Sequence, residues 1–159
     1  MSRPPRLSAV EKTEIVLPSD ANALGTAFGG RIISWVDIAG GIAAQRHCRR
    51  VVVTASMDDI HFVAPIEQGE VVVLLAQVNA AWHSSMEVGV RVLAENPLTG
   101  ERKHAATAYL TFVARDEKGR TVPVPPLVPE TADEWRRQEE AGERRAHRLE
   151  RRALRATRV

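Results

Sequence analysis

The 159-residue sequence contains a single cysteine, few aromatic residues and no long apolar run. One cysteine, Cys48, excludes an internal disulfide, which favours a cytoplasmic protein over a secreted one. No stretch of about 18 consecutive apolar residues is present, so the sequence predicts no membrane-spanning helix. Residues 1–12 lack the apolar core of a signal peptide, so we expect no secretion signal there.

Charge is unevenly distributed along the chain. The net charge is +2, yet residues 1–129 hold 13 basic and 13 acidic side chains. From Arg144 onward there are seven arginines and one glutamate. Glutamates alternate with the basic residues up to Glu143, and no aromatic residue follows Trp135. This pattern favours a solvated helix end, although a nucleic-acid contact remains an alternative.

Turn signals and β-branched runs predict one domain with a flexible start and a charged end. We expect residues 1–12 to be flexible, residues 13–129 to form the folded domain, and residues 130–159 to form a charged helical tail. The proline-rich residues 121–129 do not suit a central strand. The expected elements are a short strand over 14–17, a helix over about 31–47, strands over 51–62, 71–81, 85–94 and 105–115, and a helix over about 130–156.

The first of these helices is apolar around most of its circumference, which is typical of a helix in the middle of a domain. Asp37 lies two turns into it, where an unpaired buried carboxylate is costly. The four strands that follow are joined by hairpin turns, and their antiparallel sheet needs its apolar face covered. The sequence therefore predicts an α+β fold with an antiparallel sheet wrapped around one long central helix. No element is expected to cover the outer face or the edges of the sheet, which favours self-association.

Several short motifs, in order and without large gaps from about Glu14 to Glu140, resemble the cytosolic acyl-CoA thioester hydrolases of the hotdog fold. They are the series Asp20-Ala-Asn22-x-x-Gly25-Thr26-x-Phe28-Gly29-Gly30, Trp35-x-Asp37, Val52-Val53-Thr54, Phe62-Val-x-Pro65-Ile66-x-x-Gly69, Ser84-Ser85-Met86-Glu87-Val88 and Ala108-Tyr109-x-Thr111-Phe112. The run Leu127-Val-Pro-Glu-Thr131 resembles the brain-type acyl-CoA hydrolases in particular.

The resemblance implies a hotdog fold and hydrolysis of acyl-CoA to a free acid and CoA, with no cofactor besides the coenzyme A of the substrate. It implies homodimers with two active sites at the interface, often assembled as trimers of dimers. Asp37 matches the catalytic carboxylate of the family, and Asn22 matches an asparagine that faces it from the partner subunit. Many members carry a glycine ahead of the serine pair where this sequence has Ala81-Trp82-His83, so we expect the CoA-binding loop to differ in shape.

Asp37 suits the chemistry of thioester hydrolysis, which needs an activated water near the carbonyl carbon. It can act as a general base or attack directly as a nucleophile, and burial would raise its pKa toward a useful value. The structural alternative is a carboxylate paired with an arginine such as Arg31. Asn22 can orient the water, or it can simply support the turn at Gly25.

The backbone N–H groups of Gly29 and Gly30 lie at the expected helix start, where a developing oxyanion is stabilised. Their alternative role is close packing of the helix on the sheet. Three further positions are candidates for hydrogen bonds to the acyl-CoA, namely Thr54 and the pair Ser84 and Ser85. His83 could approach a phosphate, although an exposed turn histidine is the more common case.

Other chemistries find less support in the sequence. The five histidines show no ligand spacing, so no metal site is expected. No Gly-x-Ser-x-Gly motif is present, which argues against a serine hydrolase of the α/β class. A hotdog protein that binds acyl-CoA without turnover is the main alternative, and a hotdog dehydratase is a weaker one because no suitable His and carboxylate pair is evident.

Overall fold

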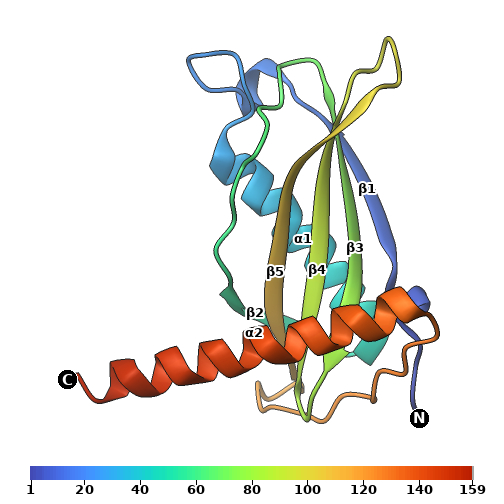
Figure 1. Ribbon diagram of the computed structural model, residues 1–159, viewed down its shortest axis with the longest axis vertical. Coiled ribbons are helices and arrows are strands. Elements are labelled where there is room, and N and C mark those ends of the chain that lie inside the picture. Colours follow the sequence, from blue (N-terminus) through green and yellow to red (C-terminus); the bar gives the residue numbers. More distant parts are fainter. Residues whose placement is uncertain (159) are drawn as a thin grey trace.

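A five-stranded antiparallel sheet curls around one long helix, and a second helix crosses the outer face of the sheet (Figure 1). The computed structural model describes residues 1–158. The strand order is β1-β3-β4-β5-β2, so β1 and β2 form the two edges. The elements are 3₁₀ helix η1 (Pro5–Ser8), β1 (Val10–Ile15), 3₁₀ helix η2 (Pro18–Asp20), α1 (Gly29–Cys48), β2 (Val51–Met57), β3 (Val71–Ala81), β4 (Ser85–Glu95), β5 (Arg102–Arg115) and α2 (Ala132–Ala156). The predicted architecture of a sheet around a central helix is confirmed.

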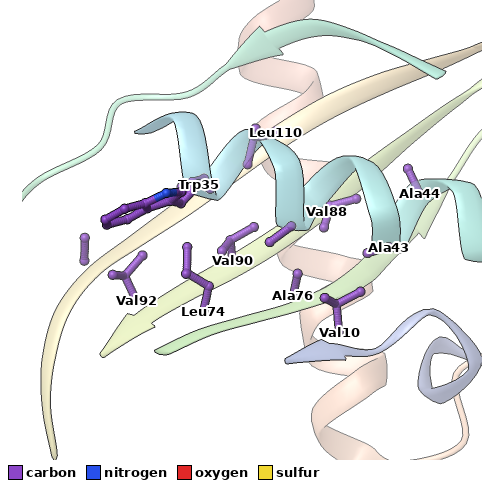
Figure 2. Close-up of a cluster of buried hydrophobic side chains, with 14 of the residues drawn as sticks. Val10, Trp35, Ala43, Ala44, Leu74, Ala76, Val88, Val90, Val92 and Leu110 are labelled. Atoms are coloured by element: carbon purple, nitrogen blue, oxygen red, sulfur yellow. The ribbon is translucent and has the colours of Figure 1, made fainter. Parts of the chain in front are cut away.

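Small residues on α1 allow the helix to lie close to the sheet. Ala39, Gly40, Ala43 and Ala44 are all buried on the face of α1 that packs on the sheet. A Cβ atom at Gly40 would lie 3.0 Å from the ring of Phe112 on β5, so the glycine makes room for that ring. Figure 2 shows the side chains of β4 beneath α1, with Trp35 at one end of the cluster. The inner face of the sheet and one face of α1 therefore form a single core.

The N-terminal residues do not form the flexible segment that the sequence predicts. β1 begins at Val10 rather than Glu14 and pairs with β3 along its whole length. Ser8 is fully buried, and its hydroxyl oxygen accepts a hydrogen bond from the backbone N–H of Val78 at 2.9 Å. The prediction is wrong because two of the partly buried positions of β1 are the charged residues Lys12 and Glu14, so the sequence lacks the apolar alternation by which a strand is recognised.

Two of the other predicted strands are close to those observed, and one is too long. The strand predicted over residues 71–81 coincides with β3, and β4 extends one residue beyond its prediction. β2 ends at Met57 rather than near Phe62, and residues 58–66 continue beside β5 with only scattered backbone hydrogen bonds. β2 also contains a bulge, because the register shifts between Thr54 and Ser56. Residues 121–129 make only isolated bridges, which agrees with the prediction for this proline-rich run.

The proline-rich run is fastened to the end of α1 by a buried histidine. His47 is 1% exposed, and its Nε2 atom lies 2.6 Å from the carbonyl oxygen of Pro125. Burial lowers the pKa of His47, because the charged imidazolium would lose its hydration. The neutral ring then donates from Nε2 to the carbonyl oxygen, which joins the C-terminal connection to the core.

The outer face of the sheet is covered by α2, contrary to the expectation that nothing covers it. Only Ala141 of α2 is fully buried, so apolar packing is a minor part of this contact. Glu87 of β4 is 0% exposed and lies beneath the helix, where its charge requires compensation. Arg144 donates to both oxygens of Glu87, with Nη2 2.7 Å from Oε1, and its guanidinium lies 3.6 Å from the centre of the Tyr109 ring. Buried ion pairs therefore attach α2 to the sheet.

We expect Arg144→Ala to lower the free energy of unfolding by roughly 3 kcal/mol, because it leaves a buried carboxylate without its two-pronged partner. Urea unfolding at one protein concentration measures this change. Arg136→Ala is the control, since Arg136 pairs with Asp133 and Glu140 at the exposed surface of the same helix. Its loss should stay below about 0.5–1 kcal/mol. Equal losses for both variants would contradict the structural role of the buried pair.

Candidate active site

The carboxylate of Asp37 is held by a hydroxyl from the neighbouring edge strand. Thr54 Oγ1 donates a hydrogen bond to Asp37 Oδ1 at 2.6 Å. Thr54 pairs with Phe112 across β2 and β5, and Phe112 packs against α1, so Thr54 faces the helix as well. Within residues 1–158, no second hydrogen bond engages Asp37, which leaves its other oxygen available to a water or a substrate.

Asp37 is half-buried, which corrects the expectation of a fully buried carboxylate. It lies on the face of α1 that points away from the middle of the sheet, and the neighbouring Ile38 is 48% exposed. The apolar pattern of the helix is therefore only partly explained by the core of one chain. The part that stays exposed provides an open surface beside the carboxylate.

The start of α1 provides free backbone donors, as the sequence predicts. Phe28 is the N-cap residue and makes no side-chain cap, while its carbonyl oxygen accepts from Arg31 and Ile32. Within the described chain, the N–H groups of Gly29 and Gly30 donate to no other residue. Unpaired N–H groups at the positive end of a helix favour an oxyanion.

Gly30 and Asp37 do not converge within one chain. Seven residues separate them along α1, which corresponds to about 10 Å along the helix axis. A thioester carbonyl at Gly30 therefore lies too far from Asp37 of the same chain for a single water to bridge them. A complete site built from both groups requires a second copy of the chain.

Asn22 is exposed, and within residues 1–158 it makes no hydrogen bond to Asp37. Its Nδ2 donates to Thr26 Oγ1 at 2.8 Å, and its Oδ1 accepts from the backbone N–H groups of Leu24 and Thr26. These bonds close a turn around Gly25, whose φ of +78° suits glycine. The structural role that the sequence allows for Asn22 is thus present, and its outward position leaves the side chain accessible.

The serine pair and His83 lie apart from Asp37. Ser85 pairs with Val113, which pairs with Val53, so Ser85 is in the row next to Thr54. Adjacent residues of a strand point to opposite faces, which places Ser85 on the outer face of the sheet. There it lines a cavity of about 660 Å³ beneath α2. His83 is exposed, and neither it nor Ser84 makes a side-chain hydrogen bond within residues 1–158.

Exposed apolar side chains surround the open face of α1, a feature that the sequence did not single out. They come from the loop before α1, from the helix, and from the segment that follows β2. They are Leu17, Leu24, Phe28, Ile38, Phe62 and Val63. A concentration of exposed apolar residues of this kind marks an interaction surface. These residues come from elements far apart in the sequence, so the hydrophobic periodicity of single segments does not predict the cluster.

Metal ligation and membrane spanning find no support within residues 1–158. No group of three or more His, Cys, Asp or Glu side chains is arranged to hold a metal ion in this range. None of the described helices combines the length and apolar character needed to cross a membrane.

Comparisons with known proteins place this chain in a family. Residues 24–101, which include Asp37 and Thr54, match the Thioesterase superfamily. The chain is 51% identical over 127 residues to an uncharacterised protein of Bacillus subtilis named as an acyl-CoA thioester hydrolase, covering 80% of this chain and 74% of that one. The chain belongs to the hotdog-fold acyl-CoA thioester hydrolases.

Other relatives of the enzyme agree with this assignment. A cytosolic acyl coenzyme A thioester hydrolase of Homo sapiens is 40% identical over 128 residues, which are 79% of this chain but 34% of that longer protein. The crystal structure of a hexameric acyl-CoA thioesterase in its apo form has a TM-score of 0.93 and 40% identity, and covers 97% of this chain and 99% of that chain. The predicted family and fold are confirmed, and the hexameric neighbour fits the predicted homo-oligomer.

An acyl-CoA hydrolase from Staphylococcus aureus bears on the site residues. Its structure in complex with butyryl coenzyme A, coenzyme A and coenzyme A disulfide has a TM-score of 0.92 and 34% identity, covering 99% of this chain and 96% of that chain. Three further structures of that enzyme carry alanine in place of an asparagine, an aspartate or a threonine. These positions are 15 and 17 residues apart in that chain, the same intervals that separate Asn22, Asp37 and Thr54 here.

We expect Gly30→Ala to lower kcat/KM by about tenfold or more with little loss of stability, because a methyl group there obstructs a thioester approaching the helix start. A Cβ atom at Gly30 would lie 2.7 Å from the ring of Phe28, which is 59% exposed and has room to turn away. Steady-state kinetics and thermal unfolding together measure the two effects.

Gly142→Ala is the matched control, since a methyl group at this helical glycine of α2 would have nothing within 4 Å of it. The substitution should raise stability by up to about 1 kcal/mol and leave kcat/KM unchanged. Wild-type kinetics in Gly30→Ala would remove the helix start from the reaction.

Proposed function

We propose that the enzyme hydrolyses acyl-CoA thioesters at a site centred on Asp37, releasing a free carboxylic acid and CoA. The hydrogen bond from Thr54 to Asp37 carries the proposal, because it orients one carboxylate oxygen and leaves the other free. Support comes from the names of the relatives and from the S. aureus variants, whose altered positions have the spacing of Asn22, Asp37 and Thr54.

In the proposed reaction, Asp37 takes a proton from a water that attacks the carbonyl carbon of the thioester. The N–H groups of Gly29 and Gly30 of the partner subunit stabilise the negative charge that develops on the carbonyl oxygen. The C–S bond then breaks, and the CoA thiolate recovers the proton from Asp37. CoA enters as part of the substrate and leaves as product, so the proposal needs no cofactor. Direct attack by Asp37 would instead give a mixed anhydride, which water then hydrolyses.

We place each proposed site between two chains, with Asn22 of the partner subunit facing Asp37. The separation of about 10 Å along α1 between Gly30 and Asp37 supports this arrangement. The exposed apolar residues around α1 supply a surface for a second copy to cover. A trimer of such dimers is the assembly we propose, since hexameric acyl-CoA thioesterases are among the structural neighbours. The single cysteine and the cytosolic relative support a cytoplasmic location for this activity.

We expect Asp37→Asn to lower kcat by about 100-fold or more, because the amide cannot accept the proton of the attacking water. Thiol release from a panel of acyl-CoAs of increasing chain length measures the loss and gives the acyl preference. Asp59→Asn is the control, since Asp59 is an exposed carboxylate just beyond β2. Binding of CoA esters by the wild type without thiol release would instead favour a binding protein.

Mixing two inactive variants tests whether the site is shared. In a heterodimer of Asp37→Asn and Asn22→Ala chains, one of the two shared sites contains both native residues. Random exchange at equal concentrations should therefore restore about a quarter of wild-type activity. No recovery after verified subunit exchange would show that Asn22 and Asp37 act within one chain.

A further inference from the structure

Arg148 of α2 makes two ion pairs that connect the helix to two parts of the sheet. Its Nη1 atom lies 2.9 Å from Asp58 Oδ2 and 3.3 Å from Glu87 Oε2. The side chains of Arg148 and Asp58 are each only 15% exposed, and that of Glu87 is fully buried. Partly buried pairs are screened less by salt than the exposed pairs of α2. Arg148 thus links Glu87, near the start of β4, to Asp58, the residue that follows β2.

Asp58, the residue that follows β2, attaches the end of this edge strand to its neighbour. Asp58 donates its backbone N–H to the carbonyl oxygen of Tyr109 at 3.0 Å, which continues the contact with β5. Just before it, the register shift between Thr54 and Ser56 leaves Ala55 without a partner. A bulge in an edge strand interrupts the ladder that would otherwise fix the strand. The Arg148 pairs hold Asp58 at the end of the short paired stretch, Ser56 and Met57, that follows this interruption.

Thr54 is the last regularly paired residue before the bulge, and its hydroxyl holds Asp37. We propose that Arg148 is a positioning residue for the reaction: by tying Asp58 to Glu87, it fixes the bulged end of β2 and thereby the hydroxyl of Thr54 against Asp37. The inference rests on the function proposed above. It gives α2, which lies on the opposite face of the sheet from Asp37, a role in catalysis through β2.

Removal of Arg148 does not leave the buried carboxylate of Glu87 without partners. Arg144 still donates to both oxygens of Glu87, and Asn79 Nδ2 lies 3.3 Å from Oε1. Asp58 is partly exposed, so its released oxygen can bind water. We therefore expect Arg148→Ala to fold and to lose less stability than Arg144→Ala, which removes the main partner of Glu87.

The first test compares the kinetics of Arg148→Ala, Arg148→Lys and Arg152→Ala. Arg148→Ala should lower kcat by about tenfold and change KM by less than about twofold, since a small displacement of Thr54 affects the reacting groups more than binding. Arg148→Lys should recover part of kcat, because the ammonium can still pair with Asp58. Arg152 lies one turn further along the same face of α2 without an ion pair in the described chain, and Arg152→Ala should match the wild type.

The second test asks whether the effect passes through Thr54. In a Thr54→Ala background the hydroxyl is already absent, so adding Arg148→Ala should lower kcat no further. A loss in the double variant equal to the product of the two single losses would overturn the proposal. An unchanged kcat in Arg148→Ala would also overturn it.

Hydrogen exchange gives a reading that does not depend on activity. Amides over residues 51–58 should exchange faster in Arg148→Ala than in the wild type or in Arg152→Ala, with the rest of the sheet unchanged. Unchanged exchange over this range contradicts the tie between Arg148 and β2. Absence of Asp37-dependent thiol release in the wild type instead contradicts the proposed function, so the two failures are distinguishable.

Discussion

The close contact between α1 and the inner face of the sheet is the constraint on which the molecule depends. The small residues of α1 and the large ring of Phe112 fit together at Gly40, where even a methyl group would crowd the ring. A sheet that wraps one helix covers only part of its circumference. The uncovered part carries Asp37 and the exposed Ile38. The geometry that builds the core therefore also produces the open surface beside the candidate catalytic carboxylate.

The two faces of the sheet are stabilised by different interactions. Apolar side chains cover the inner face, whereas the outer face holds α2 through Glu87, Arg144 and Arg148. Removing one partner from a buried ion pair is costly, so the position of α2 depends on a few specific side chains. One of these contacts reaches Asp58 at the end of β2. The ion pairs beneath α2 and the candidate site at Asp37 therefore both involve the edge strand β2.

Much of the fold was predictable because it follows from local patterns. β3 coincides with its predicted range, since its β-branched run is bounded by clear turn residues. The start of β1 was predicted four residues too late, because Lys12 and Glu14 are charged although partly buried, and because its pairing with β3 bridges about 60 residues of sequence. The burial of Glu87 could not be predicted either, since the arginines that balance its charge lie 57 and 61 residues away in the sequence.

Among the candidate site residues, the sequence identified Asp37 and Thr54 as separate candidates, and the structure joins them by a hydrogen bond. Ser85 shows the opposite outcome. It lies one row from Thr54, yet the alternation of side chains along a strand places it on the other face. Thr54 and Ser85 were both candidates for hydrogen bonds to the acyl-CoA, yet they lie on opposite faces of the sheet.

The sequence by itself determined the central helix and most strands, because these depend on composition and periodicity within short segments, and its short motifs carried the resemblance to the family. Tertiary structure alone decided which side of α1 stays open, which face each strand residue occupies and how α2 is attached. The physical reason is that these properties depend on strand register and on pairing between distant charges. Neither is encoded within any single segment of the chain.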